Sequence, residues 1–155
     1  GFQWYHSVIS SMEAAGLTPC HIPAMWHKVG HQGQTRNPEM RLGSVFEPFI
    51  YARKDQSGII RQPGRTNSFS YKALSPEVKV HPTERPIEMI EEVIKTFCSP
   101  GGHIMIPFLG SGNTLLAAAN RGSTCFGFDL SEEYKNSFIA RVMAGEPGKY
   151  KSYTV

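Results

Sequence analysis

The sequence has 155 residues, enough for one domain with a core of its own. Apolar residues make up 40% of it, which argues against disorder, and no apolar run approaches the ~20 residues that span a bilayer, so we expect neither a membrane segment nor a signal peptide. The net charge is only +3, but residues 26–85 hold ten of the sixteen basic residues and only five acidic ones. This local excess of positive charge suits a surface that faces phosphates, and the alternative is an ordinary solvent-exposed face.

The chain starts with Gly1 and not with methionine, which indicates either a processed chain or a piece of a longer one. Its three cysteines are widely spaced and form no Cys-x-x-Cys pair, which argues against a disulfide framework and favours a reducing cytoplasm. Histidines gather within residues 21–31, but their spacing is no standard zinc pattern, and we expect no metal site.

The first third of the chain predicts one helix and two strands. Residues 7–15 predict a short helix closed by Gly16, which suits a helix C-cap. Residues 20–28 predict a strand, and Pro23 within it favours an edge position, because proline cannot donate to the hydrogen-bond ladder of a sheet. Residues 45–52 predict a second strand, and we expect the two strands to pair antiparallel.

The next segment, residues 55–80, shows no clear period. It is rich in Gly, Pro, Ser, Arg and Lys, which predicts a long loop or a small irregular insert. Loops of that length in compact domains are usually functional or disordered.

The rest of the chain alternates regularly between helices and strands. Apolar residues every three to four positions from Ile87 to Phe97 predict a helix, which Pro86 is suited to open because its missing N–H costs nothing in the first turn. Ser131 is the predicted N-cap of the last helix. The other predicted elements are a strand over residues 103–106, a helix over residues 114–120 and a strand over residues 124–128. This alternation is typical of an α/β layer with parallel strands.

A glycine-rich turn, Gly110-Ser111-Gly112, follows the first of these strands. Glycine lets the backbone approach a ligand closely, and the helix N-terminus behind the turn suits an anionic group. Asp129 ends the next strand, 19 residues after Gly110, where its carboxylate is suited to accept hydrogen bonds from two ribose hydroxyls. Together these features predict a nucleoside-binding site, and the alternative is an ordinary tight turn. No Gly-Lys-Ser/Thr follows, so the turn is not a P-loop.

Several segments follow one another in order along the second half of the chain. They are His-Pro-Thr-Glu-Arg-Pro at residues 81–86, Pro-Phe-Leu-Gly-Ser-Gly-Asn-Thr at residues 107–114, Gly-Phe-Asp at residues 127–129, and Tyr134. Their order, spacing and identities resemble the DNA N6-adenine/N4-cytosine amino-methyltransferases, in the subgroup whose catalytic motif precedes the cofactor motifs. The resemblance covers about residues 80–142. Upstream, a helix ending in Ala-Gly-Leu, a strand ending near residues 26–28 and a strand at residues 46–54 are more weakly similar to the last sheet hairpin of that family.

The resemblance implies an α/β, Rossmann-like S-adenosylmethionine-dependent methyltransferase fold that is incomplete here. It divides the single partial domain into four segments with different roles. Residues 1–54 would supply a helix and the terminal hairpin, residues 55–80 a basic loop or target-recognition insert, residues 81–142 the cofactor-binding half, and residues 143–155 a tail.

The same resemblance implies S-adenosylmethionine as cofactor and double-stranded DNA as partner. Asp129 would hold the ribose, Leu130 would cover one face of the adenine, and Phe108 would pack near the cofactor. The residues implied around its methionine part are Thr83, Gly110, Ser111, Gly112, Asn113 and Thr114. The candidates for contacts with DNA phosphates, which position a protein without reading sequence, are Arg53, Lys54, Arg61, Arg65, Lys72 and Lys79.

The sequence also departs from the family pattern. Ile106 stands where the family commonly has an aspartate close to the charged groups of the cofactor, and Asn113 replaces the usual threonine. The catalytic Asp/Asn/Ser-Pro-Pro-Tyr/Phe/Trp occurs nowhere in the 155 residues, so we expect no catalytic residue here and no methyl transfer by this chain alone. Without that segment the strands would expose unpaired edges. We therefore expect a truncated piece, or a chain whose sheet a partner completes.

Two other functions stay open. One is a catalytically inactive nucleoside- or DNA-binding module derived from the same fold, to which Ile106 lends some support. The other is a related Rossmann-like domain that binds a different nucleotide.

Overall fold

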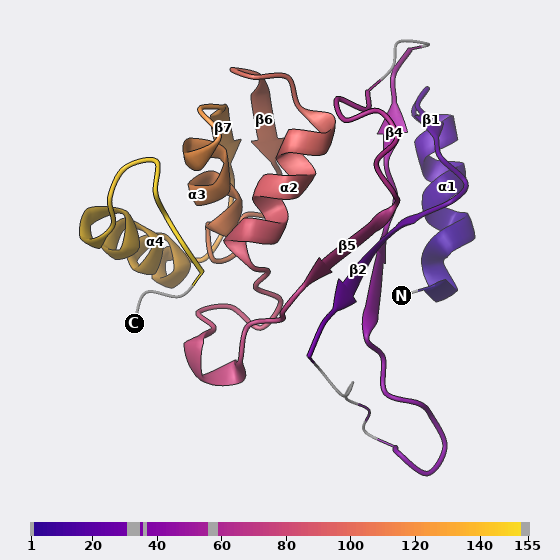
Figure 1. Ribbon diagram of the computed structural model, residues 1–155, viewed down its shortest axis with the longest axis horizontal. Helices are drawn as coiled ribbons and strands as arrows, with labels where there is room; N and C mark the ends of the chain where they lie inside the picture. Colours follow the sequence, from indigo (N-terminus) through magenta and orange to yellow (C-terminus); the bar gives the residue numbers. More distant parts are fainter. Residues whose placement is uncertain (1, 31–34, 36, 56–58, 153–155) are drawn as a thin grey trace. The chain divides into compact units, whose positions relative to one another are not determined.

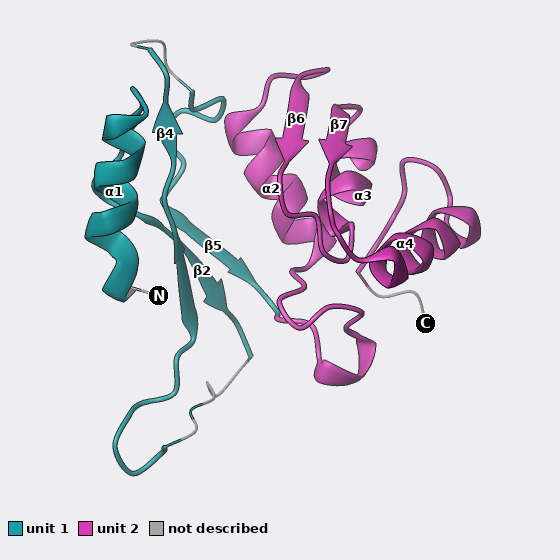
Figure 2. Cartoon of the chain, turned by 180° about the vertical axis from the view of Figure 1, so that it is seen from behind, with its two compact units in different colours: residues 1–72 teal, residues 73–155 magenta. Residues whose placement is uncertain are grey.

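The computed structural model of the chain describes residues 2–30, 35, 37–55 and 59–152. The chain forms two compact units, Gly1–Lys72 and Ala73–Val155, which Figure 2 shows in teal and magenta. The first unit contains a three-stranded and a two-stranded sheet, and the second unit contains a two-stranded sheet. Within the described ranges, no helix combines the length and the apolar character needed to cross a membrane.

The first unit begins with a helix, α1 (Tyr5–Ala14), which follows a short 3-10 turn, η1 (Phe2–Trp4). The sequence predicts this helix over residues 7–15, and the structure confirms it with a start two residues earlier. The chain leaves the helix through Gly16, whose φ of +76° lies in the left-handed region that glycine adopts without strain.

A three-stranded sheet forms the centre of the first unit (Figure 1). Its middle strand, β2 (Ala24–Lys28), pairs antiparallel with β3 (Phe46–Phe49), as the sequence predicts. On its other side β2 pairs parallel with β5 (Ser68–Tyr71). Trp26 lies opposite Phe69 across that pair, and both side chains are buried, so this face of the sheet belongs to the core of the unit.

The structure corrects two predictions for this unit. The edge position expected from Pro23 does not occur, because Pro23 precedes the first residue of β2 and leaves its ladder intact. The irregular backbone expected across residues 55–80 is interrupted by β5 and by a 3-10 turn, η2 (Pro76–Val78). The sequence Ser-Phe-Ser-Tyr alone gives little indication of a strand. β5 forms because it pairs by hydrogen bonds with β2.

Two further short strands extend the hairpin of the first unit. β1 (Thr18–Pro19) pairs antiparallel with β4 (Ala52–Arg53), and the N–H of Cys20 donates to the carbonyl of Tyr51 at 2.9 Å. The predicted strand over residues 45–52 is therefore two strands, β3 and β4, with a break between them.

The second unit is an α/β layer. β6 (His103–Ile106) and β7 (Thr124–Gly127) pair parallel, as predicted, and α2 (Ile87–Phe97) and α3 (Asn113–Asn120) pack against them. The last helix, α4 (Glu132–Ala144), begins after Ser131, whose Oγ accepts from the N–H of Tyr134 at 3.3 Å, so the predicted cap is confirmed. The buried core consists of Ile87, Ile94, Leu116, Ala117 and Ala118.

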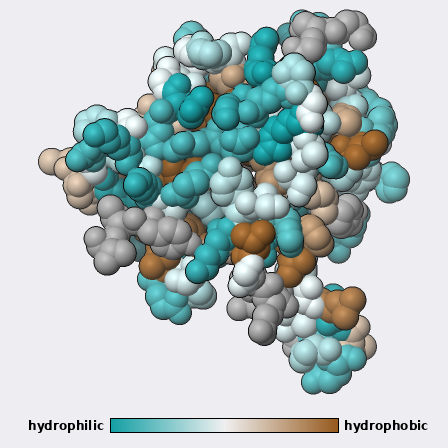
Figure 3. Space-filling model, viewed as in Figure 1, coloured by the Kyte–Doolittle hydropathy of each residue, from teal (hydrophilic) through white to brown (hydrophobic). Residues whose placement is uncertain are grey.

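Only one face of the β6–β7 sheet is covered within the second unit. Ile104 and Cys125 point to the core, whereas Met105 and Phe126 on the opposite face are 70% and 58% exposed. Figure 2 shows the two strands in front of α2 and α3 with no element of the unit over them. The face seen in Figure 3 is by contrast largely hydrophilic, with its apolar residues in separate small patches. Among the described residues, β6 and β7 pair only with each other.

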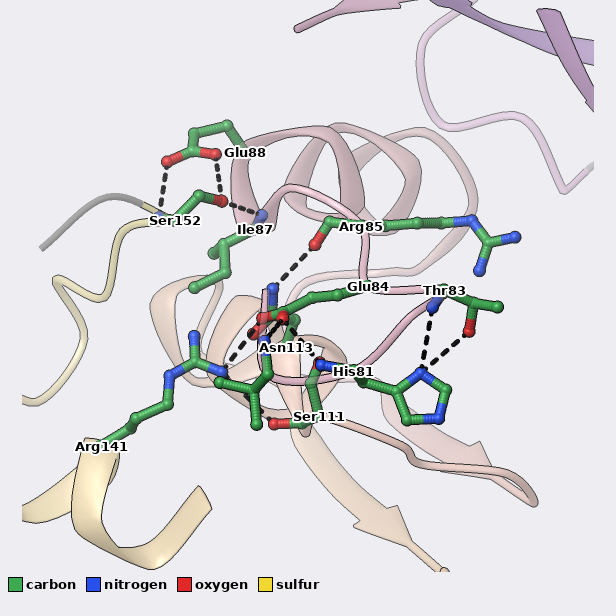
Figure 4. Close-up of polar contacts among 11 residues, drawn as sticks. His81, Thr83, Glu84, Arg85, Ile87, Glu88, Ser111, Asn113, Arg141 and Ser152 are labelled. Atoms are coloured by element: carbon green, nitrogen blue, oxygen red, sulfur yellow. Dashed lines mark hydrogen bonds and ion pairs between the residues drawn. The ribbon is translucent and has the colours of Figure 1, made fainter. Parts of the chain in front are cut away.

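The segment after α4 returns to the helices of the second unit. The side chain of Asn120 donates from Nδ2 to the carbonyl of Tyr150 at 2.6 Å and accepts from its N–H at 2.8 Å. Two residues later, the Oγ of Ser152 donates to Glu88 at 2.7 Å and accepts from the N–H of Ile87 at 2.5 Å (Figure 4). The tail thereby contacts α3 and the start of α2.

Candidate functional site

The turn between β6 and α3 has two glycines with positive φ, and they serve different purposes. Gly110 has φ +58°, and a Cβ there would lie 3.5 Å from the ring of His81, an ordinary contact distance. Gly112, at φ +81°, is the N-cap of α3, and a Cβ there would lie 2.3 Å from the ring of Phe138. Gly110 is therefore needed for its backbone conformation, and Gly112 also for the packing of α4.

Asp129 follows β7, and its carboxylate connects by hydrogen bonds the two loops that follow the parallel strands β6 and β7. Its Oδ2 accepts from the N–H of Gly110 at 2.7 Å, and its Oδ1 accepts from the N–H of Ser131 at 2.9 Å. The bond from Ser131, then that from Gly110, holds the pKa of the Asp129 carboxyl below its ordinary value. The side chain is exposed and charged, and each oxygen keeps a second lone pair for a ligand.

A buried carboxylate shapes the segment that precedes α2. Glu84 accepts at Oε2 from the N–H of Val80 at 2.6 Å, and its Oε1 forms an ion pair with Nη1 of Arg141 at 3.2 Å. The same Arg141 nitrogen lies 3.4 Å from the carbonyl of Ser111 in the glycine-rich turn (Figure 4). The ion pair thus connects three segments that meet at the site, and the sequence motifs give no sign of this pairing.

His81 positions Thr83 within the same segment. Nδ1 of the ring accepts from the N–H of Thr83 at 3.2 Å and lies 3.0 Å from its Oγ1 (Figure 4). The other side of the ring contacts Tyr134 edge to face, with 4.7 Å between ring centroids.

Asn113, the first residue of α3, is buried, with 3% of its surface exposed. Its Nδ2 donates to the carbonyl of Arg85 at 2.7 Å, which fixes the orientation of the amide. Its Oδ1 is buried and has no hydrogen-bond partner among the described residues.

Two adjoining cavities open at the carboxyl ends of β6 and β7. The smaller, of about 230 Å³, has mixed polar and apolar walls, and its polar residues include Thr83, Ser111, Asn113 and Thr114. The larger, of about 560 Å³, is mainly apolar, with Leu115, Phe128 and Leu130 among its walls. Both cavities are lined by Leu109, Gly110 and Asp129.

The smaller cavity brings together seven of the nine residues that the sequence predicts for the cofactor. They are Thr83, Phe108, Gly110, Ser111, Asn113, Thr114 and Asp129. Leu130 lines the larger cavity instead, and Gly112 lines neither, because it is occupied with the packing of Phe138. Glu84, Arg85 and His81 also line the smaller cavity, although the sequence does not single them out as ligand-binding residues.

The six predicted DNA-contacting residues divide between the units. Lys54, Arg61 and Lys72 are exposed in the first unit, and Arg53 is partly buried there. Arg65 lies with its guanidinium 3.8 Å from the ring centre of Phe69 and donates to the carbonyls of Thr66 and Ser68. Lys79 belongs to the second unit, where its Nζ donates to the carbonyl of Pro82 at 3.4 Å. Arg65 therefore has a structural role as well.

The family model for N6/N4 DNA methylases matches residues 21–140. The chain belongs to this DNA methylase family. The putative methylase YubD of Escherichia coli (strain K12) is 36% identical over 64 residues, which are 41% of this chain and 28% of that protein. Type II methyltransferase M.ScaI of Streptomyces caespitosus is 42% identical over 74 residues, which are 47% of this chain and 24% of that protein. The matched segments thus amount to about a quarter of each relative's length.

A solved structure extends the likeness to most of this DNA methylase chain. The crystal structure of the M1.HpyAVI–SAM complex matches with a TM-score of 0.79 at 22% identity, and the match covers 92% of this chain and 71% of that one. The likeness confirms the predicted α/β fold of the S-adenosylmethionine-dependent methyltransferases. The family match confirms the resemblance found in the sequence.

Proposed function

We propose that the chain is the cofactor-binding part of a DNA methyltransferase that transfers a methyl group from S-adenosylmethionine to an exocyclic amino group of adenine or cytosine. The observation that carries this proposal is the pair of adjoining cavities, one with mixed polar and apolar walls and one mainly apolar, with Asp129 in the wall of both. Ligand sites of this kind combine apolar walls with a few polar groups that fix orientation.

The two cavities suit the two ends of this cofactor. S-adenosylmethionine carries a zwitterionic amino acid at one end and an adenine at the other, with a ribose between them. The smaller cavity contains the N-terminus of α3, whose N–H groups and dipole favour a carboxylate. Leu115 and Leu130 of the larger cavity offer apolar contacts for the adenine, and Asp129 keeps lone pairs for the ribose hydroxyls. When bound, the cofactor supplies the methyl group through its sulfonium.

The remaining chemistry has to come from outside these 155 residues. The Asp/Asn/Ser-Pro-Pro-aromatic motif, which accepts hydrogen bonds from the target amino group and stacks on the flipped base, is absent from the sequence. Among the described residues β6 and β7 pair only with each other, which supports the view that another segment or a partner chain completes this sheet. The exposed face with Met105 and Phe126 is likewise suited to be covered by such a segment. Methyl transfer therefore requires that additional segment.

Double-stranded DNA is the partner in this proposal, and the cytoplasm is the proposed location, which the absence of a Cys-x-x-Cys pair supports. The exposed Lys54, Arg61 and Lys72 of the first unit support it, because lysine and arginine side chains that face solvent are suited to phosphate contacts. A catalytically inactive binding module remains the second candidate, and the observation that favours it is Ile106, which removes a carboxylate that the family commonly places near the cofactor.

Calorimetric titration of the chain with S-adenosylhomocysteine tests the cofactor half of the proposal. We expect saturable binding, a rise in melting temperature with ligand concentration, and a loss of affinity of about tenfold or more in Asp129→Ala. Glu39→Ala, which removes an exposed carboxylate in the first unit, is the matched control and keeps the wild-type affinity. Absence of both binding heat and thermal stabilisation in the wild-type chain contradicts the proposal.

A further inference from the structure

We propose that His81 is a positioning residue of the cofactor site, which holds Thr83 at the wall of the smaller cavity by accepting hydrogen bonds at Nδ1 of its neutral ring. The assignment rests on the proposed function, because it names a residue that prepares the same site for its ligand. It follows from the direction of the hydrogen bond with Thr83, from the packing of the ring, and from the charges around it.

The contact between His81 and Thr83 requires a neutral ring. The backbone N–H of Thr83 can only donate, so Nδ1 of His81, 3.2 Å away, accepts and carries no proton. The hydroxyl of Thr83 lies 3.0 Å from the same nitrogen, within reach to donate to it as well. A protonated ring would instead bring an N–H against the backbone N–H of Thr83 and lose that bond.

This contact shapes the segment that precedes α2. A side-chain acceptor that binds the N–H two residues later forms the same local turn as asparagine and aspartate in Asx turns. The carbonyl of His81 also accepts from the N–H of Glu84 at 2.9 Å, which closes the turn a second time. His81 and Thr83 both line the smaller cavity, and Thr83 is exposed. The way Thr83 faces this cavity therefore depends on Nδ1 of His81 (Figure 4).

The ring of His81 adds packing that an asparagine in the same turn would lack. It contacts Tyr134 of α4 edge to face, with 4.7 Å between ring centroids. It also lies beside Gly110, where a Cβ would be 3.5 Å from the ring atoms. Gly110 and Tyr134 line the larger cavity, so His81 connects the position of Thr83 in one cavity to the wall of the other.

The charges around His81 indicate what its protonation changes. The pKa of the Asp129 carboxyl is lowered first by the N–H of Ser131 and last by the nearby His81, so these two side chains lie close enough to interact. The charged or titratable side chains near the ring, or linked to its segment, are Asp129, Tyr134, Glu84, Arg85, Arg141 and Lys79.

Protonation of His81 is expected to weaken ligand binding in two ways. It breaks the bond that holds Thr83, and it gives Asp129 a cationic neighbour that competes for the lone pairs offered to the ribose hydroxyls. The amino acid end of the ligand is zwitterionic, so the added charge attracts its carboxylate and repels its ammonium, and these two effects largely offset each other.

The pH dependence of S-adenosylhomocysteine binding to the full chain tests this assignment. Between about pH 5.5 and 7.5 the amino acid end of this ligand keeps its charges, whereas imidazole side chains titrate. We expect the Kd from calorimetry to rise about tenfold from neutral pH to about pH 5.5. His103→Asn, which replaces an exposed histidine of the second unit, is the matched control and keeps the wild-type profile.

Two substitutions of His81 separate its acceptor from its ring. His81→Asn keeps an acceptor at the position of Nδ1 but does not titrate, so its Kd should stay within about threefold of the neutral wild-type value at every pH. His81→Phe keeps a ring for Tyr134 but has no acceptor, so its Kd should be about tenfold higher at every pH.

The outcomes distinguish this assignment from the proposed function. A wild-type Kd that does not rise toward acid pH overturns the role of His81 while the proposed function stands. A His81→Asn variant that keeps the wild-type pH profile does the same, and neither result depends on whether His81→Phe folds. A wild-type chain that binds no S-adenosylhomocysteine at any of these pH values contradicts both.

Discussion

The carboxylate of Glu84 and the guanidinium of Arg141 form an ion pair at 3.2 Å between residues that lie 57 positions apart. The Glu84 side chain is 2% exposed and that of Arg141 25%. A carboxylate so deeply buried needs such partners, because its desolvation is otherwise costly. Arg141 also contacts the carbonyl of Ser111, so this pair holds α4, the segment before α2 and the glycine-rich turn in one arrangement.

Removal of the Glu84 carboxylate is expected to destabilise the chain. Glu84→Ala leaves the N–H of Val80 and the guanidinium of Arg141 without their acceptor, and we expect a loss of about 3 kcal/mol in the free energy of unfolding, measured with urea. Glu84→Gln keeps the shape of the side chain but only one acceptor oxygen, so either the N–H of Val80 or the guanidinium of Arg141 faces its NH2 group, and we expect a loss of about 2 kcal/mol. Equal losses in the two variants would show that retained shape and one retained oxygen contribute nothing, which would contradict the expected order.

Acid is expected to weaken the contribution of Asp129 to stability. The N–H groups of Ser131 and Gly110 lower the pKa of this carboxyl in the folded chain from its ordinary value of 3.8. A lowered folded-state pKa means that the stabilisation is present above the unfolded pKa and is lost as pH falls through the folded one. In urea titrations between roughly pH 3 and 7, the wild type should exceed Asp129→Asn in stability at neutral pH, and the gap should close below about pH 4. A gap that stays constant with pH would contradict this account.

The regular half of the molecule is predictable because its signals are local. The strand over residues 103–106 has the bounds expected from the sequence, since the apolar run and the Gly-rich segments that flank it define it without reference to other elements. β5 is not predictable in the same way. Its four residues bury only Phe69, and their strand conformation depends on pairing with β2, which lies more than forty positions earlier.

The candidate site likewise has some features that local sequence predicts and others that depend on distant segments. The cavity-lining positions on the β6–α3 turn follow from a motif whose residues are adjacent in sequence, and most of them line one cavity in the structure. The pairing of Glu84 with Arg141 and the orphan oxygen of Asn113 depend instead on how distant segments pack. Sequence motifs name the residues that touch a ligand more readily than those that hold them in place.

The two glycines of the turn are expected to differ in their tolerance of alanine. Gly112→Ala places a methyl group 2.3 Å from the ring of Phe138, in a backbone conformation with φ +81°, and should cost about 3 kcal/mol. Gly110→Ala meets only an ordinary contact with His81 and should cost about 1 kcal/mol from its positive φ. Urea unfolding of both variants gives the comparison.

A double-mutant cycle isolates the steric part of the Gly112 effect. Phe138→Ala removes the ring, so Gly112→Ala introduced into that background should cost only the ~1 kcal/mol of backbone strain. A cost that is the same in both backgrounds would contradict the explanation from α4 packing.

Substitutions of Arg65 and Arg61 are expected to differ in their effect on the free energy of unfolding, although both residues are candidates for DNA contacts. Arg65→Ala removes the contact with Phe69 and the bonds to the carbonyls of Thr66 and Ser68, and should cost about 1–2 kcal/mol. Arg61 is exposed, so Arg61→Ala should leave stability within about 0.5 kcal/mol. If both contact phosphate, each variant also lowers the salt dependence of DNA binding by about one unit in the log–log slope. A stable Arg65→Ala would contradict its structural role.

Ser152 is expected to stabilise the start of α2 from the end of the chain. Its Oγ accepts from the N–H of Ile87, the first residue of the helix, and both Oγ and the backbone N–H of Ser152 donate to Glu88. The N-cap position itself holds Pro86, which has no side-chain acceptor, so Ser152 supplies from the tail what a capping residue supplies locally. Ser152→Ala should therefore lower the free energy of unfolding by about 1 kcal/mol, as measured with urea. Lys151→Ala, which removes an exposed neighbouring side chain, is the matched control and is expected to leave the free energy of unfolding unchanged. Equal free energies of unfolding in the two variants would show that the tail does not cap α2.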